Sequence, residues 1–207
     1  PKSFPWEAGN TWMRTDLYCQ RFKFERPKKI QTAVAETVKS IHSPGIFVLE
    51  APMGAGKTEA ALVAAEAFAN ISKRSGVFFA LPTQATSDGI FPRMLKWVKS
   101  LESNCEHSIM LAHGKAQFNE EYEELRMLEG SKHTSVDCDS GIIVHDWFEG
   151  KKKSLLADFV VGTIDQLLLA ALKQKHVMLR HLGLGNKVVI IDECHAYDAY
   201  MSRYLDM

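Results

Sequence analysis

Two short stretches of this 207-residue chain combine residue types suited to phosphate and magnesium chemistry. The first reads Ala51-Pro-Met-Gly-Ala-Gly-Lys-Thr58. Gly54 and Gly56 let the backbone approach an anion closely, and the free N–H groups of a helix starting after them point at the same place. Lys57 is positioned to reach the β- and γ-phosphates of ATP, and the Thr58 hydroxyl to bind Mg²⁺. The residues predicted to bind the nucleotide here are Met53, Gly54, Ala55, Gly56, Lys57 and Thr58.

The second stretch, Ile190-Ile-Asp-Glu-Cys-His195, ends an apolar run with two carboxylates. Asp192 can hold Mg²⁺, typically through water, and Glu193 can orient or deprotonate the water that attacks the γ-phosphate. Taken alone, the pair is equally well explained as a strand that ends in solvent. The upstream phosphate loop favours the catalytic interpretation. We therefore predict ATP and Mg²⁺ as cofactors and Lys57, Asp192 and Glu193 as catalytic residues.

Apolar, β-branched runs recur along the chain, and each is followed by a helix-like stretch. Strands are predicted at 46–49, 77–81, 108–111, 159–161 and 188–191, and helices at 59–70, 86–101, 117–130 and 164–173. This alternation indicates βαβ units, and strands that are apolar throughout are typical of a sheet covered on both faces. The predicted fold class is α/β: a P-loop NTPase domain with a mostly parallel sheet and helices on both faces.

Two regions fit this pattern less well. Residues 1–25, with Trp6 and Trp12, show no clear period and are expected to be a lead-in segment that packs on the core. Residues 131–156 are polar and irregular, and we expect a surface insertion there. The main domain is therefore predicted to cover residues 26–207.

The composition limits the class of protein. Hydrophobic residues make up 46% of the chain, and 25 basic residues balance 25 acidic ones, so any attraction for nucleic acid must come from local clusters. Residues 26–29 and 151–153 could form such clusters, or could be ordinary solvated charges. The four cysteines form no CxxC pair, which argues against a zinc site. The chain has neither a signal peptide nor a run of ~18 apolar residues, so we expect a cytoplasmic protein without a membrane partner. A first residue other than Met suggests part of a longer protein.

The remaining residues indicate which P-loop protein this is. Asp192-Glu-Cys-His195 resembles the DEAD/DEAH signature of superfamily 2 helicases, and Ala51, in place of the usual first Gly, is common in that group. Arg26-Pro-Lys-Lys-Ile-Gln31 resembles their Q motif, in which the Gln contacts adenine. The resemblance implies that Gln31 binds the base. Phe24 either packs on the adenine or belongs to the core.

The resemblance narrows to the helicase–nuclease of type I CRISPR interference and covers the chain from about residue 24 to its end. It rests on Phe79-Ala-Leu-Pro-Thr-Gln-Ala-Thr86, Leu111-Ala-His-Gly114, Leu155-Leu-Ala157, Val161-Gly-Thr-Ile-Asp-Gln166 and Val189-Ile-Ile-Asp-Glu-Cys-His-Ala-Tyr-Asp198. The resemblance implies the first RecA-like helicase lobe of an enzyme that the CRISPR surveillance complex (Cascade) recruits. Such an enzyme translocates 3′→5′ on single-stranded DNA and degrades it.

The same resemblance implies two further parts, an HD nuclease domain and a second RecA-like lobe with an arginine finger. Neither is expected within this chain. An arginine finger contributes ~10³–10⁵ in rate, so the lobe alone is expected to bind ATP with slow turnover or none.

Nucleic-acid contacts are expected where helices begin beside the strands. Pro82, Thr83, Gln84 and Thr163 could offer amides and hydroxyls to a DNA phosphate. For the first three the alternative is an ordinary turn, and for Thr163 a capping box with Gln166. His195 is expected to couple the ATP site to the second lobe, or else to be satisfied within the fold.

Two other functions remain open at this stage. One is a general superfamily 2 helicase that acts on RNA or duplex DNA. The other, for this segment in isolation, is a nucleotide-binding module without turnover.

Overall fold

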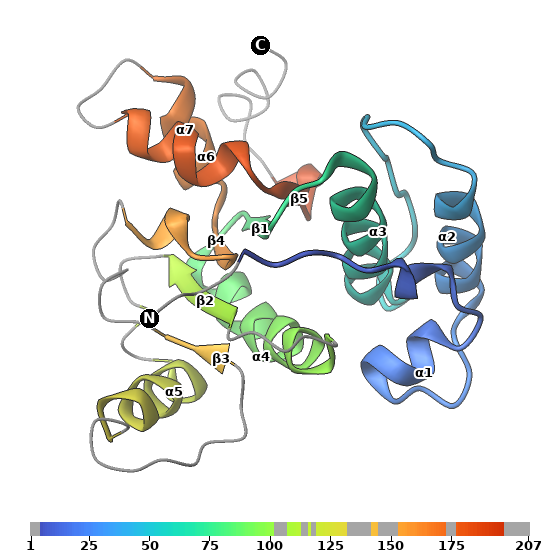
Figure 1. The fold of residues 1–207 in the computed structure, drawn as a ribbon, viewed down its shortest axis with the longest axis horizontal. Coiled ribbons are helices and arrows are strands. Elements are labelled where there is room, and N and C mark those ends of the chain that lie inside the picture. Colours follow the sequence, from blue (N-terminus) through green and yellow to red (C-terminus); the bar gives the residue numbers. More distant parts are fainter. Residues whose placement is uncertain are drawn as a thin grey trace.

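The computed structural model describes residues 5–101, 107–112, 116, 119–131, 142–144, 153–172 and 177–196. Its centre is a parallel sheet with the strand order β3-β2-β4-β1-β5 (Figure 1). The strands are β1 (Val77–Leu81), β2 (His107–Ala112), β3 (Ile142–Ile143), β4 (Phe159–Thr163) and β5 (Val188–Ile191). This is the α/β, RecA-like fold that the sequence predicted.

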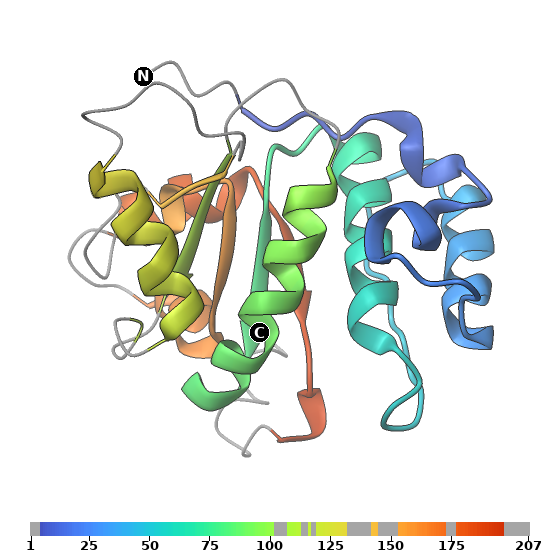
Figure 2. The same ribbon diagram turned by 90° about the horizontal axis from the view of Figure 1, so that it is seen from below.

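Helices cover both faces of the sheet. Figure 1 shows α6 and α7 on one side of the strands and α4 and α5 on the other. Helix α3 stands at the β5 end of the sheet, and α2 and α1 lie beyond it in both views (Figures 1 and 2). None of the described helices is long and apolar enough to cross a lipid bilayer. The helices are α1 (Leu17–Phe22), α2 (Lys29–Lys39), α3 (Lys57–Ser72), α4 (Gln84–Ser100), α5 (Glu120–Ser131), α6 (Ile164–Ala171) and α7 (Val177–Gly185).

Four of the five predicted strands and all four predicted helices are present. Every residue of β1, β2 and β4 is buried, as expected for strands covered on both faces. Strand β5 is only partly buried and forms an edge of the described sheet. Helices α1, α2 and α7 were not predicted.

The prediction of a strand at 46–49 is wrong. The segment packs Phe47 and Leu49 between α2 and α3, while Ile46 is 95% and Val48 83% exposed. Alternate side chains thus face the helices and the solvent, which is the burial pattern of a strand without a sheet partner. Because α3 lies between this segment and β5, the segment forms no strand pairing among the described residues.

The N-terminal segment is anchored by aromatic rings and by one buried ion pair. The ring centroids of Trp6 and Phe159 lie 5.1 Å apart. Arg21, in α1, donates from Nη2 to Glu66 Oε1 in α3 at 2.7 Å, and both side chains are buried. Helix α1 escaped prediction because it has only six residues, and the four-residue spacing of Tyr18 and Phe22 is too short a pattern to indicate a helix.

Most of the predicted insertion at 131–156 lies outside the described residues. The described part includes Ile142–Ile143, which pairs with β2 as β3, and Ile142 and Val144 are buried. These residues belong to the sheet edge and the core, because their run of β-branched side chains favours a buried strand over a surface loop.

Candidate nucleotide site

The phosphate loop has the backbone that its glycines allow. Gly54 has a φ of 73° and Gly56 a φ of 89°, both in the left-handed region. Gly56 directly precedes α3, and a Cβ built on it would collide with the Gln31 side-chain amide. A side chain at Gly56 is therefore excluded by both conformation and space.

Two lysines lie over this loop. Lys57 Nζ donates to the carbonyl oxygen of Ala51 at 3.0 Å, and Lys28 Nζ donates to that of Gly54 at 2.5 Å. Lys57 was predicted as a site residue, and Lys28 was missed although it lies within the Q-like string. Both ammonium groups are close enough to turn toward a phosphate in the loop.

The first turn of α2 and the residues before it form a second wall of the cavity. Gln31 is 1% exposed; its Oε1 accepts from Lys28 N at 2.9 Å, and its Nε2 donates to Gly56 O at 3.4 Å. Gln31 therefore ties the start of α2 to the phosphate loop. Phe24 lines the cavity and stacks on Phe22 at 5.6 Å, which in turn stacks on Tyr18 at 6.0 Å.

The acidic pair follows β5. Asp192 N donates to Ala80 O at 3.1 Å, which extends the strand pairing by one residue. Glu193 has a φ of 56°, and its N–H donates to Asp192 Oδ1 at 2.8 Å. A left-handed conformation costs a non-glycine residue about 1–3 kcal/mol, and such strain clusters at functional sites. Burial and the two neighbouring carboxylates raise the pKa of the Cys194 thiol.

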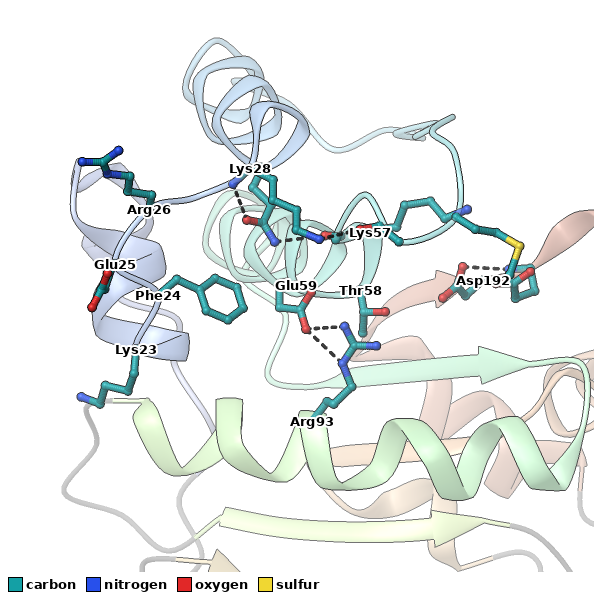
Figure 3. Close-up of a pocket in the computed structure, with 15 residues that line it drawn as sticks. Lys23, Phe24, Glu25, Arg26, Lys28, Lys57, Thr58, Glu59, Arg93 and Asp192 are labelled. Atoms are coloured by element: carbon teal, nitrogen blue, oxygen red, sulfur yellow. Dashed lines mark hydrogen bonds and ion pairs between the residues drawn. The ribbon is translucent and has the colours of Figure 1, made fainter.

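The phosphate loop, the wall around the start of α2 and the acidic pair line one cavity (Figure 3). Its volume is about 760 Å³, within the size range of small-molecule sites. Of the predicted nucleotide and catalytic residues, Ala55 alone is not among its lining residues. The predicted residues in the lining are Gln31, Met53, Gly54, Gly56, Lys57, Thr58, Asp192 and Glu193. The residues that the prediction lacked are Lys23, Glu25, Arg26, Lys28, Glu59 and Arg93, and Phe24 was left open.

The donor chemistry of this cavity fits magnesium. Thr58 and Asp192 offer a hydroxyl and a carboxylate from opposite elements, and Mg²⁺ prefers oxygen ligands. The described residues contain no group of three His, Cys, Asp or Glu side chains that could hold a metal by themselves. This is the arrangement expected where nucleotide phosphates and water complete the ligand set.

The residues predicted to contact nucleic acid lie at the same edge of the sheet. Leu81 is in register with Thr163, so the loops after β1 and β4 are neighbours. Thr83 caps α4 by accepting from Thr86 N at 3.2 Å, and both Thr83 and Gln84 are exposed. Pro82, between β1 and this cap, is half-buried.

The start of α6 lacks the capping bonds that were predicted for Thr163 and Gln166. Thr163 precedes α6 but is only 7% exposed and makes no side-chain capping bond. The capping box with Gln166 is wrong, because Gln166 Oε1 accepts from Arg180 Nη1 at 2.9 Å instead. His195 lies in the short turn Cys194–Ala196, and its side chain is outside the described part.

Comparisons with known proteins show what this chain is similar to. The family model described as type III restriction enzyme, res subunit, matches residues 24–205. The chain is 49% identical, over 97% of its length, to the CRISPR-associated nuclease/helicase Cas3 of Streptococcus thermophilus, and 38% identical, over 79%, to Cas3 of Escherichia coli K12. It covers 22% and 18% of those proteins, or about a fifth of their length.

Solved structures give the same result. The crystal structure of T. fusca Cas3-ATP matches with a TM-score of 0.79 and 32% identity, covering 98% of this chain and 21% of that one. The Cas3-AMPPNP structure from the same organism matches with a TM-score of 0.77 and 31% identity. The chain therefore belongs to the family described as the res subunit of type III restriction enzymes, and its resemblance to the helicase–nuclease of type I CRISPR interference is confirmed.

Proposed function

We propose that this chain is the ATP-binding motor lobe of an ATP-dependent translocase on single-stranded DNA in type I CRISPR interference. The observation that carries the proposal is the single cavity in which the phosphate loop, the aromatic wall and the acidic pair meet. The matched relatives are named as CRISPR-associated nuclease/helicases, and the matched structures include Cas3-ATP and Cas3-AMPPNP. In the proposed enzyme, residues 26–207 form this lobe, and residues 1–25 pack on it.

Different residues of the cavity are proposed to bind different parts of ATP. The loop amides after Met53, together with Lys57 and Lys28, attract the phosphates. The adenine is proposed to pack on Phe24, on the ring face away from Phe22, and Gln31 lines the same cavity. This assignment gives each wall of the cavity one part of the nucleotide.

Hydrolysis needs a base and charge neutralisation. Thr58 and Asp192 would hold Mg²⁺, which neutralises charge on the β- and γ-phosphates when bound. Glu193 accepts the proton of the attacking water, and its backbone N–H holds the Asp192 carboxylate in place. A second RecA-like lobe of the same protein completes the site with an arginine.

The DNA backbone is proposed to run along the carboxyl edge of the sheet. Thr83 and Gln84 offer exposed groups at the start of α4, and Thr163 stands at the start of α6, where a helix presents amides to a phosphate. His195, just after the acidic pair, couples ATP to the second lobe. In the cytoplasm, Cascade would recruit the enzyme, and its nuclease domain would cut the strand.

The proposal is tested by replacing Lys57. In the full-length protein, Lys57→Ala should lower ATP affinity by roughly tenfold to hundredfold, because charged hydrogen bonds to phosphate are lost. Lys99→Ala, an exposed lysine of α4 outside the cavity, is the matched control. Calorimetry measures both, and unchanged affinity in Lys57→Ala would remove the P-loop assignment.

The choice of nucleic acid is tested separately. The ATPase rate of the full-length protein should rise more with single-stranded DNA than with single-stranded RNA. A stronger response to RNA or to duplex DNA would favour a general superfamily 2 helicase.

A further inference from the structure

An ion pair between Glu59 and Arg93 lies in the wall of the nucleotide cavity and has no part in the mechanism above (Figure 3). Glu59 follows Thr58 directly in the first turn of α3, and its side chain is 10% exposed. Arg93 comes from α4, and its side chain is 43% exposed. The pair thus joins two helices at the place where the phosphate loop ends.

Both hydrogen bonds of the pair go to the same oxygen of Glu59. Arg93 Nε donates to Glu59 Oε1 at 3.0 Å, and Nη2 donates to the same oxygen. Among the described residues, the third nitrogen, Nη1, has no hydrogen-bond partner. The guanidinium therefore neutralises the carboxylate and keeps one N–H donor group for a ligand.

A carboxylate at this position works against the proposed ligand. A polyphosphate carries several negative charges, and the first turn of α3 is where its oxygens would lie. Little solvent reaches Glu59 to screen its charge. Its field extends to the Tyr18 hydroxyl, whose pKa is raised by burial and by the Glu59 charge.

We propose that Arg93 is a positioning residue of the nucleotide site, which neutralises Glu59 beside the phosphate loop and so admits a polyphosphate. This inference rests on the proposed ATP-binding function. It assigns a role to a residue of α4, outside the phosphate loop, the acidic pair and the Q-like segment. It also explains why Glu59 can stand next to Thr58 without repelling the ligand.

The experiment measures affinity by calorimetry for adenosine, AMP, ADP and AMPPNP in the full-length protein. Arg93→Gln should weaken AMPPNP by roughly tenfold to hundredfold, since it leaves a charged partner unpaired in the site. The loss should shrink with each phosphate removed and vanish for adenosine. Adding Glu59→Gln should restore AMPPNP affinity to within about threefold of the wild type, because the unpaired carboxylate is removed together with its partner.

Two further variants separate charge from packing. Arg93→Lys keeps the positive charge and should retain most AMPPNP affinity. This variant tests the inference independently, should Arg93→Gln fail to fold. Lys99→Gln removes an exposed positive charge elsewhere on α4 and should leave the affinity of every ligand unchanged.

Equal losses for adenosine and AMPPNP in Arg93→Gln would overturn the inference, as would a double variant no better than Arg93→Gln alone, or a large loss in Arg93→Lys. A wild-type protein that binds no AMPPNP would remove the proposed function itself. The two failures are distinguishable because only the first leaves wild-type binding intact.

Discussion

The two ends of the parallel strands use polar residues in opposite ways. At the carboxyl ends, Asp192, Glu193 and Thr83 face a cavity or solvent. At the amino ends, Ser108 and Asp158 bond to each other inside the protein. The same sheet thus carries an open end that can bind a ligand and a closed end that holds the strands together.

At the closed end, Ser108 and Asp158 form hydrogen bonds with each other in both directions. Asp158 Oδ2 accepts from Ser108 N at 3.0 Å and from Ser108 Oγ at 2.8 Å, while Asp158 N donates to Ser108 Oγ. Gly76 lies against the Asp158 backbone and Lys187. Burial lowers the pKa of Lys187 to about 8, although the Asp158 charge opposes the shift.

The difference shows which end can change without loss of the fold. At the open end, one residue holds a strained backbone and the charged groups face outward, so substitutions there should alter binding and turnover. At the closed end, Ser108 and Asp158 bond to each other and Gly76 lies against Asp158 and Lys187, so substitutions there should alter stability alone.

The largest effect is expected from Glu193→Gln at the open end. Loss of the base should reduce ATP turnover of the full-length protein about 10²–10⁴-fold, with ATP binding retained. Steady-state ATPase with single-stranded DNA measures the effect, and Glu36→Gln, in an exposed carboxylate of α2, is the control. Brisk DNA-stimulated turnover in Glu193→Gln would end its assignment as the base.

The next effect belongs to the closed end. Gly76→Ala places a Cβ against the Asp158 carbonyl oxygen and 3.3 Å from Lys187 Cγ. Overpacking against backbone should lower the free energy of unfolding by about 1–3 kcal/mol, while ATP affinity of the folded protein stays the same. Urea denaturation measures the loss.

The matched glycine is Gly89, whose Cβ position in α4 has open space around it. Gly89→Ala should stabilise the helix by about 0.5–1 kcal/mol. If Gly76→Ala matched Gly89→Ala in stability, or if it changed ATP affinity, the closed end would not have the purely structural role assigned to it.

A smaller effect is expected from Lys187→Met, and it depends on pH. The folded-state pKa of about 8 lies below the usual lysine value of 10.5, so the unfolded chain binds more protons between these values. The free energy of unfolding of the wild type should therefore rise as pH increases from about 8 to 10.5. Below pH 8 both states carry the charge, and the burial penalty is fully present.

Lys187→Met removes that penalty and the rise with pH. The variant should be more stable than the wild type at pH 7, with the difference shrinking toward pH 10.5. Denaturation at a series of pH values tests this. A variant less stable at pH 7 would show that the attraction of Lys187 to Asp158 outweighs its burial.

The open end could be predicted from sequence because its chemistry is local. Gly54, Gly56, Lys57 and Thr58 are neighbours in the chain, and an apolar run followed by Asp192 needs no knowledge of distant partners. The apolar runs likewise predicted β1, β2, β4 and β5. Local spacing was thus enough for most of the sheet and for the phosphate half of the site.

The remaining features depend on contacts between distant residues. The pairing of Arg93 with Glu59 joins residues 34 positions apart, and Arg180 competes with Thr163 for Gln166 across 14 positions. The segment at 46–49 has the residue types of a strand, but α3 takes the place where its partner would lie. None of these outcomes has a signal in local periodicity.

The smallest effect is expected from Thr83→Ala. This variant tests whether a residue that caps a helix at the open end also contacts DNA. The variant loses the Oγ1 acceptor for Thr86 N, but Thr86 Oγ1 still accepts from the residue 83 N–H at 3.2 Å. The loss in unfolding free energy should therefore be about 0.5–1 kcal/mol, at the low end for a cap. Affinity of the full-length protein for single-stranded DNA should fall severalfold, since an exposed hydroxyl beside the helix start is removed. Thr83→Ser keeps the hydroxyl and should preserve both quantities. If Thr83→Ala lowered stability and left DNA affinity unchanged, Thr83 would act like Ser108 at the closed end, as a structural residue only.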